Sequence, residues 1–243
     1  MNGLALTVAA ALWGAAAGVL LPRAAYRFAV PAGEPWRDRC PEEHLLRGWL
    51  GRSACAECAA PPSFPGPALG PGLVCALLCA ALAAVTGARP EVGAWLLLAP
   101  VGVLLAVVDF RVRRLPDPLT LPFAAAALGL LGVAALLPGH AGHWPTALYG
   151  ALALGAGYFV LWLVNPAGMG FGDVKLALGA GAVLGWYGWP TVLLGTFAGF
   201  LFGALYGGAL VVVRKAGRKT AIPFGPFLIA GACAGLLAGA GAA

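Results

Sequence analysis

The sequence carries little charge, and this shortage excludes the class of soluble globular domains. Only 10% of its 243 residues are charged, whereas 61% are hydrophobic. A soluble domain has about 25% charged residues, and so apolar a surface would not stay dissolved. Apolar runs long enough to cross about 30 Å of hydrocarbon recur along most of the chain. The composition therefore predicts an all-α polytopic membrane protein embedded in a lipid bilayer.

Positive charge is also absent ahead of the first apolar run. A secretory signal peptide carries its positive charge before the apolar region. In this sequence no Lys or Arg precedes Leu21, and Arg23 and Arg27 come after it. The first run is therefore predicted to be a retained membrane span with its N-terminus outside.

The apolar runs predict about eight transmembrane helices, at roughly 3–22, 68–88, 92–110, 118–138, 145–164, 173–189, 191–213 and 223–242. With eight spans, every basic residue except Arg89 falls on one side of the membrane. These residues are Arg23, Arg27, Arg37, Arg39, Arg47, Arg52, Arg111, Arg113, Arg114, Lys175, Arg214, Lys215, Arg218 and Lys219. The positive-inside rule makes that side cytoplasmic and places both termini outside. Topology thus accounts for the net charge of +6, and nucleic acid is not an expected partner.

One long connection divides the chain into three parts. Residues 1–22 form the first transmembrane helix, and residues 23–67 form a small cytoplasmic loop domain with three of the six cysteines. Residues 68–243 form a membrane-embedded core of about seven helices. The oligomeric state stays open.

Two acidic residues, Asp109 and Asp173, lie at the cytoplasmic ends of predicted spans. Ionisable groups at such positions are costly and are functional candidates. A carboxylate at a helix C-terminus, as expected for Asp109, opposes the helix dipole. Two carboxyl groups held together would share a proton, so that one could activate water while the other polarises a carbonyl. The simpler interpretation, a helix N-cap, fits Asp117 well and is open for Asp173.

Glycines precede the second of these aspartates. Gly168, Gly170 and Gly172 leave the backbone without side chains, which would let an extended substrate lie beside Asp173. The alternative is an ordinary flexible loop between helices.

These residues resemble the type IV prepilin peptidases, bacterial members of the GxGD aspartyl proteases. The resemblance rests on Asp109 to Pro122, on Gly168-Met-Gly-Phe-Gly-Asp-Val-Lys175, on Ile222-Pro-Phe-Gly-Pro-Phe227 and on the cysteine loop. It implies an aspartic endopeptidase of the bacterial inner membrane with Asp109 and Asp173 as catalytic pair. It also implies that pilin-like precursors are cut after a glycine on the cytoplasmic side, without a cofactor. Lys175 matches a family lysine that could alter the charge of the aspartate pair or touch substrate. An equal interpretation is that its side chain only extends to the membrane–water interface.

The cysteine loop departs from the two CxxC pairs often found in that family. Cys55 and Cys58 form one pair, whereas the first pair reads Cys40-Pro-Glu-Glu-His44. Three thiolates with His44 would suit a structural zinc, and Glu43 is a less favoured fourth ligand. The alternative is a group of free cytosolic thiols. The remaining cysteines lie within spans and are expected to pack.

Methylation and ion transport are two further functions to consider for such a chain. Members of that family often also methylate the new N-terminus of the cut pilin with S-adenosylmethionine. Residues 18–27 match the corresponding family segment only loosely, and a Gly-rich nucleotide fingerprint is lacking. The sequence therefore favours proteolysis without N-methylation. The alternative from another class is a proton- or cation-coupled transporter that uses the same aspartates.

Overall fold

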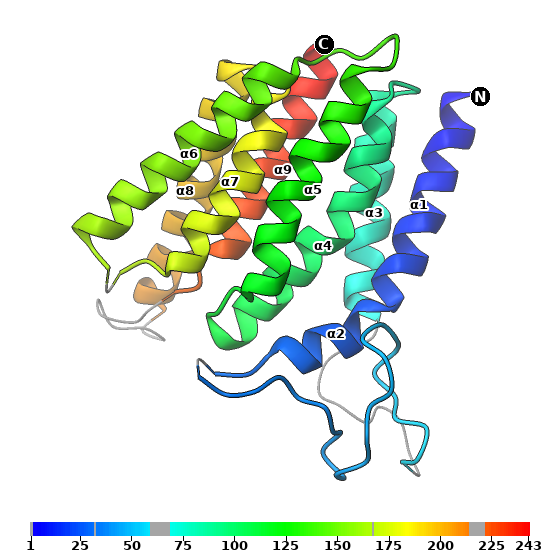
Figure 1. Cartoon of the computed structure of the whole chain (residues 1–243), viewed down its shortest axis with the longest axis vertical. Coiled ribbons are helices and arrows are strands. Elements are labelled where there is room, and N and C mark those ends of the chain that lie inside the picture. Colours follow the sequence, from blue (N-terminus) through cyan, green and yellow to red (C-terminus); the bar gives the residue numbers. More distant parts are fainter. Residues whose placement is uncertain (1, 32, 59–68, 167, 214–221) are drawn as a thin grey trace.

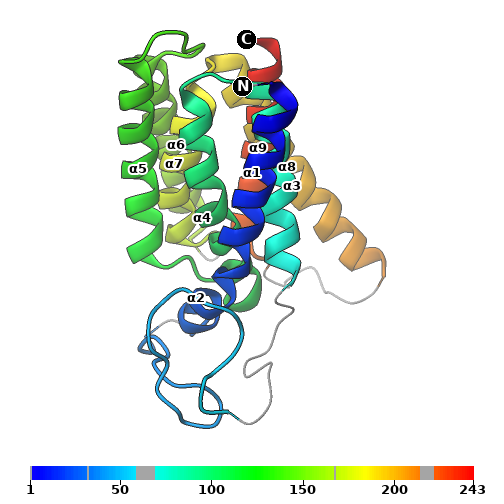
Figure 2. The same ribbon diagram turned by 90° about the vertical axis from the view of Figure 1, so that its right-hand side faces the viewer.

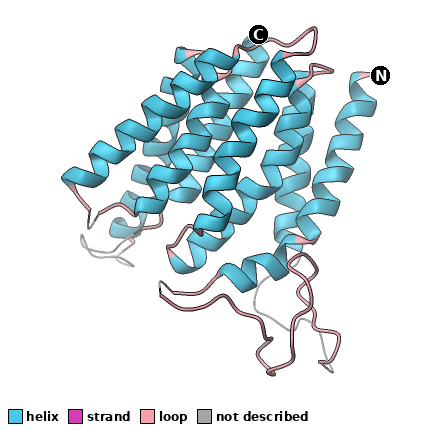
Figure 3. Cartoon of the chain, viewed as in Figure 1, coloured by secondary structure: helices cyan, strands magenta, loops and turns pink. Residues whose placement is uncertain are grey.

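The computed structural model describes residues 2–31, 33–58, 69–166, 168–213 and 222–243. Within these ranges the chain forms nine helices, and its only β pairing is an isolated bridge between Arg39 and Leu45 (Figure 3). In chain order the helices are α1 (Gly3–Val19), α2 (Leu21–Phe28), α3 (Leu69–Thr86), α4 (Glu91–Val112), α5 (Asp117–Ala135), α6 (Trp144–Val164), α7 (Phe171–Gly185), α8 (Trp189–Val212) and α9 (Gly225–Ala242). The predicted all-α fold class is confirmed.

The long helices form one bundle, and the short helix α2 lies across one end of it (Figures 1 and 2). We call this the loop end, because residues 29–58 lie beyond it. Both termini lie at the opposite end, which we call the far end. Arg89 is at the far end, where its guanidinium donates a hydrogen bond to the carbonyl of Ala240 at 3.1 Å. The basic segment 214–219 lies outside the described residues.

Each predicted span coincides with a helix, but the count of eight membrane crossings is not confirmed. In the described part of the chain, five helices are long and apolar enough to cross a membrane, or six if the bent pair α1 and α2 counts as one span. Helix α3 falls among the shorter apolar helices. Helix α7 has 15 residues, which reach about 22 Å, because Pro166 and the glycines that follow it delay the start of the helix to Phe171.

Helix α7 lies in the interior of the bundle, and small residues bring it close to its neighbour α6. Eleven of its 15 residues are buried. A Cβ atom on Gly150 of α6 or on Gly181 of α7 would overlap the backbone carbonyl of the other residue. Close backbone approach at small residues is how membrane helices gain packing contacts. The backbone that begins at Phe171 is thereby held firmly within the bundle.

Helix α2 joins the bundle to the loop. The Arg23 guanidinium donates hydrogen bonds to the carbonyls of Arg47 at 2.8 Å and Ala54 at 3.2 Å. Arg27 donates to the carbonyl of Gly48 at 2.8 Å and stacks over the ring of Trp49. These two arginines, interpreted from the sequence only as topology signals, also hold the loop in place.

Candidate active site and metal-binding loop

Asp109 lies in the last turn of α4 and is only 4% exposed. Its Oδ2 atom accepts a hydrogen bond from the backbone N–H of Gly225 at 3.0 Å. Gly225 is the first residue of α9, so the carboxyl group faces the N-terminus of that helix. The positive end of α9 offsets the unfavourable C-terminal end of α4. This contact explains how a carboxyl group is tolerated at that position.

Asp173 is the third residue of α7 and is 6% exposed. Its Oδ2 atom accepts a hydrogen bond from the backbone N–H of Gly170 at 3.2 Å. Gly170 is the N-cap of α7, so Asp173 is not the N-cap itself but makes the return bond of a capping box from the third helical position. The capping bond occupies one carboxyl oxygen. Both aspartates are therefore held in the same way, each by one backbone N–H at the start of a helix.

The two aspartates line one cavity of about 340 Å³ at the loop end of the bundle. Its wall combines the end of α4, the turn into α5, the segment before α7 and the residues that lead into α9. The lining residues are Asp109, Arg113, Arg114, Leu115, Pro166, Gly168, Met169, Gly170, Phe171, Gly172, Asp173, Ile222, Pro223 and Phe224. The structure thus brings together the three membrane motifs that were singled out in the sequence.

Two glycines let the walls of this cavity come together. A Cβ atom on Gly172 would lie 2.8 Å from the Cβ of Leu115, and one on Gly225 would lie 2.7 Å from Oδ2 of Asp109. A Cβ on Gly170 would meet nothing closer than Oδ2 of Asp173, at 3.5 Å. Gly170 therefore contributes its N–H group, whereas Gly172 and Gly225 are required by close contact. Gly225 was not predicted as a site residue, although it lies in the motif that begins at Ile222.

Lys175 and Asp117 pair with each other outside the cavity. The Lys175 ammonium lies 2.7 Å from Oδ1 of Asp117 and 5.1 Å from the ring centre of Phe171. The N-cap of α5 is Pro116, and the side chain of Asp117 makes no capping hydrogen bond. The prediction that Asp117 is a helix cap is therefore wrong. Lys175, expected to support the pair or to touch substrate, is instead held by Asp117 and does not line the cavity.

Arg114 links the cavity to the loop, a contact that the sequence analysis missed. It lines the cavity, and its guanidinium donates a hydrogen bond to the carbonyl of Pro31 at 2.7 Å. The same group lies 4.5 Å above the ring of Trp36. In the sequence, Arg111, Arg113 and Arg114 together indicate only the cytoplasmic side of the membrane. Nothing in that segment singles out Arg114 as the residue that contacts the loop.

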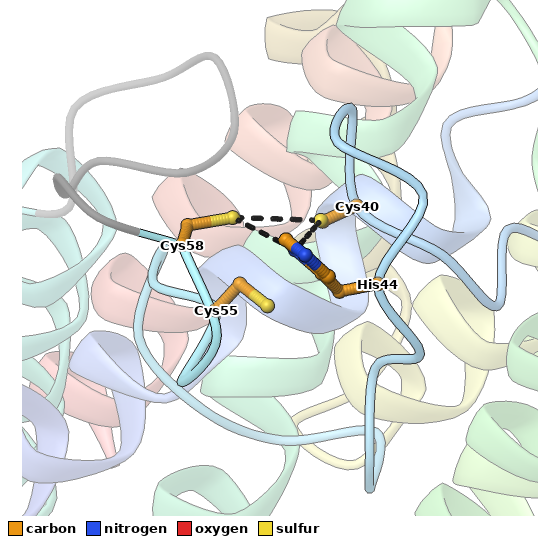
Figure 4. A group of neighbouring side chains, drawn as sticks. All are labelled: Cys40, His44, Cys55 and Cys58. Carbon is orange, nitrogen blue, oxygen red and sulfur yellow. Dashed lines mark hydrogen bonds between the residues drawn. The ribbon is translucent and has the colours of Figure 1, made fainter.

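Four predicted ligands converge in the loop (Figure 4). The ligand atoms of Cys40, His44, Cys55 and Cys58 all lie within 4.8 Å of one another. The Sγ atoms of Cys40 and Cys58 are 3.6 Å apart, and Nδ1 of His44 lies 3.6 Å from the first and 3.5 Å from the second. A tetrahedral zinc ion with ordinary bond lengths separates its ligand atoms by about 3.6 to 3.8 Å. The group therefore fits a structural metal, with His44 rather than Glu43 as the fourth ligand.

The environment of Cys40 favours the thiolate form that such a site needs. Burial raises the pKa of the Cys40 thiol. Hydrogen bonds with the backbone of His44 and Glu42 and with the side chain of Cys58 lower it by more, so the net pKa falls to about 7. Only the thiolate is a metal ligand. A bound zinc would tie the two arms of the loop together and supply no reaction chemistry.

The fold and the site together define a class: a multi-pass membrane protein with two buried carboxyl groups facing one cavity at an end of its helix bundle. Residues 96–208, which include both aspartates, match the type IV leader peptidase family. A protein of Stutzerimonas stutzeri, named prepilin leader peptidase/N-methyltransferase, is 32% identical over 223 residues, which cover 82% of this chain and 73% of the relative. The chain belongs to the type IV leader peptidase family.

Proteins of the same printed name from other bacteria also match. One from Aeromonas salmonicida is 40% identical over 147 residues, 56% of this chain and 45% of the relative. One from Aeromonas hydrophila is 38% identical over 199 residues, 75% of this chain and 62% of the relative. The chain thus spans about half to two thirds of the length of these two relatives. No solved structure matches, and the family match gives the transporter alternative no support.

Proposed function

We propose that this protein is a prepilin leader peptidase of the bacterial inner membrane, with Asp109 and Asp173 as its catalytic pair. The observation that supports this most directly is that two buried carboxyl groups from different helices line the same cavity. Both also belong to the segment that matches a peptidase family. A structural role alone would not require both groups to face one cavity.

In the proposed reaction one carboxyl group is ionised and the other is protonated, because two adjacent buried charges repel. The ionised group takes a proton from water as the water oxygen attacks the carbonyl carbon of the peptide. The protonated group gives its proton to the carbonyl oxygen, which forms a neutral tetrahedral diol. Collapse of the diol breaks the C–N bond: the carboxyl group that took up the water proton gives it to the leaving amine, and a diol hydroxyl returns its proton to the other carboxylate. The hydrogen bonds from Gly170 and Gly225 orient the two carboxyl groups throughout.

The substrate in this proposal is the leader of a pilin-like precursor, bound in an extended form. The backbone from Gly170 to Gly172 lines the cavity next to Asp173, and such bare backbone can pair with an extended peptide. We assign the loop end to the cytoplasmic side because all described basic residues except Arg89 belong to it. The leader would then be cut on the cytoplasmic side, after a glycine.

Proteolysis in this proposal uses no cofactor, and zinc in the loop would be structural. The relatives are named for N-methyltransferase activity as well, but we do not propose it for this chain. S-adenosylmethionine would be a cofactor only if that activity is retained. Mass spectrometry of the cleaved product distinguishes the two cases, because methylation replaces one hydrogen of the new N-terminal amine with a methyl group and so adds the mass of one CH2.

The test is cleavage of a pilin-like precursor co-expressed with the full chain, followed by the size shift of the product. Asp109→Asn and Asp173→Asn keep the shape of each side chain and remove its charge, so each variant should abolish the shift. Asp117→Asn is the matched control, because Asp117 lies at the same end of the bundle but outside the cavity.

Persistent cleavage by either cavity variant would remove that aspartate from the mechanism. Loss of cleavage in Asp117→Asn as well would show that the assay reports folding rather than chemistry. Failure of the unaltered chain on several precursors, with the protein folded in the membrane, would count against a peptidase.

A further inference from the structure

A second hollow lies at the loop end, between α3, α4 and α9. It has a volume of about 560 Å³ and an almost wholly apolar lining, to which Val74, Val107 and Ile229 contribute from the three helices. This volume is in the range of about 300–1,000 Å³ that ligand pockets occupy. We call it the lipid-facing groove, because its walls are three apolar helices of a membrane protein.

The groove covers a similar depth on each of its three helices. Its lining extends from Gly70 to Leu78 on α3 and from Pro226 to Cys233 on α9. On α4 it extends from Val103 to Phe110 and Arg111. Seven or eight residues of helix rise about 10 to 12 Å, which is most of the thickness of one leaflet, since the whole hydrocarbon layer is about 30 Å thick. The groove thus begins at headgroup level and ends before the middle of the bilayer.

A concentration of positive charge marks the headgroup end of the groove. Among the described residues, Arg111 is the only charged one in the lining, and no carboxylate of that part of the chain pairs with it. Arg37, from the loop, lies close enough for the like charges of the two guanidinium groups to interact. Arg37 donates a hydrogen bond to the carbonyl of Tyr26 at 3.2 Å and lies 4.8 Å from the centre of the Tyr26 ring, so both of these partners are neutral groups. Two cations beside an apolar channel are complementary to one anion with an apolar tail.

The groove is separate from the cavity that holds the aspartates. None of the residues lining the groove also lines that cavity. Successive residues of an α-helix are about 100° apart, so Arg111 and Asp109 point to opposite sides of α4. Occupation of the groove therefore does not require the peptide-cleavage chemistry, and the inference is independent of the proposed function.

We propose that the lipid-facing groove is a binding site for an anionic phospholipid. The phosphate group lies against Arg111 and Arg37, and an acyl chain lies along α3, α4 and α9. Basic pockets between membrane helices at headgroup level bind anionic headgroups in this way. A zwitterionic lipid fits the same apolar channel, but its ammonium group faces the two guanidinium groups unfavourably.

The experiment is native mass spectrometry of the detergent-purified full chain, titrated with phosphatidylglycerol or phosphatidylcholine of identical acyl chains. We expect phosphatidylglycerol to bind more tightly. Because one arginine near an anionic lipid surface contributes about fivefold to binding, Arg111→Gln should weaken phosphatidylglycerol binding by about that factor. Adding Arg37→Gln should bring its affinity to that of phosphatidylcholine. Arg52→Gln, at an exposed loop position, should change neither affinity.

A second variant tests the channel rather than the charges. Ala106→Phe places a ring in the groove, since Ala106 is part of its lining, and should abolish binding of both lipids without loss of folding. Equal affinity for the two lipids, or unchanged binding in Arg111→Gln or Ala106→Phe, would overturn the proposal. Photo-crosslinking from position 106 to the apolar segment of a pilin-like precursor, in place of lipid, would assign the groove to a protein substrate and also overturn it.

Discussion

The helix bundle buries carboxyl groups at both ends, but their surroundings differ between the two ends. At the loop end, Asp109 and Asp173 are 4% and 6% exposed and face a cavity. At the far end, Glu91 is 0% exposed. Its Oε1 atom accepts hydrogen bonds from the backbone N–H of Ala141 at 3.2 Å and from the hydroxyl of Tyr187 at 3.4 Å. Glu91 thus joins three connections of the bundle and lines none of the cavities described above.

This comparison shows that burial alone does not identify a catalytic carboxyl group. A carboxyl group whose hydrogen bonds join separate segments stabilises the fold, because its removal leaves buried donors without partners. A carboxyl group that faces a cavity beside a second one is placed to react with a bound molecule. The two ends therefore predict opposite consequences of substitution: loss of activity at the loop end and loss of stability at the far end.

The largest effect is expected for neutral substitutions in the cavity. Asp109→Asn or Asp173→Asn should lower the cleavage rate by about a thousandfold or more, since acid–base groups contribute about 10²–10⁴-fold and both partners act on one step. The apparent melting temperature in detergent should stay the same or rise, because a buried charge is removed. A clear fall in melting temperature would place these aspartates with Glu91 as structural groups.

The next effect concerns the position of Asp109 rather than its charge. Gly225→Ala places a Cβ atom 2.7 Å from Oδ2 of Asp109, so the carboxyl group must move. A displacement of about 1 Å at a catalytic group costs about a hundredfold, and the cleavage rate should fall by ten- to a hundredfold. Gly241→Ala is the control on the same helix, where a Cβ atom would meet nothing within 4 Å. Equal rates for the two variants would show that the contact between α9 and Asp109 does not matter.

At the far end we expect the reverse result. Glu91→Ala leaves the N–H of Ala141 and the hydroxyl of Tyr187 without their acceptor, and should lower the free energy of unfolding by about 2 kcal/mol. The cleavage rate per folded molecule should not change. Glu91→Gln retains one acceptor oxygen and should be milder. Thermal unfolding together with the rate assay measures both quantities. A Glu91 variant that melts normally but cannot cleave would contradict the structural role of Glu91.

The functional residues at the loop end could largely be predicted from the sequence, because they belong to short local motifs. The apolar runs located the helices, and the motifs around Asp109 and Asp173 located the cavity. The four metal ligands were predicted as well, since His44 stands one position after the place where the second cysteine of a CxxC pair is often found. Each of these signals lies within a few consecutive residues.

Other features depend on contacts between distant segments, which a single sequence does not reveal. No local motif marks Glu91, because its partners Ala141 and Tyr187 are 50 and 96 positions away. Gly225 approaches Asp109 across 116 positions. The cap predicted for Asp117 failed for a related reason: its side chain pairs with Lys175, which lies on another helix.

A smaller effect on cleavage is expected from the metal-binding loop. Cys58→Ser should lower the zinc content of the purified protein from about one ion per chain to almost none, because each ligand contributes to a closed tetrahedral site. Cys233→Ala is the control, since Cys233 lies in α9. Cleavage should fall only several-fold, because the loop reaches the cavity through Arg114. Unchanged zinc content, measured by elemental mass spectrometry, would refute the assignment of ligands.

The smallest effect is expected for Lys175, and it separates two interpretations of this residue. The ion pair with Asp117 is short, at 2.7 Å, but 60% of the Asp117 side chain is exposed, so solvent screens it and its contribution is about 0.5 kcal/mol or less. Lys175→Gln should therefore change the cleavage rate by less than about twofold, as should Asp117→Asn, if the pair acts only as this surface contact. If Lys175→Gln instead lowers the rate about a hundredfold while Asp117→Asn does not, Lys175 must leave Asp117 when substrate binds. The lysine would then act on the substrate or on the aspartate pair, and the loop end would contain a third functional charge.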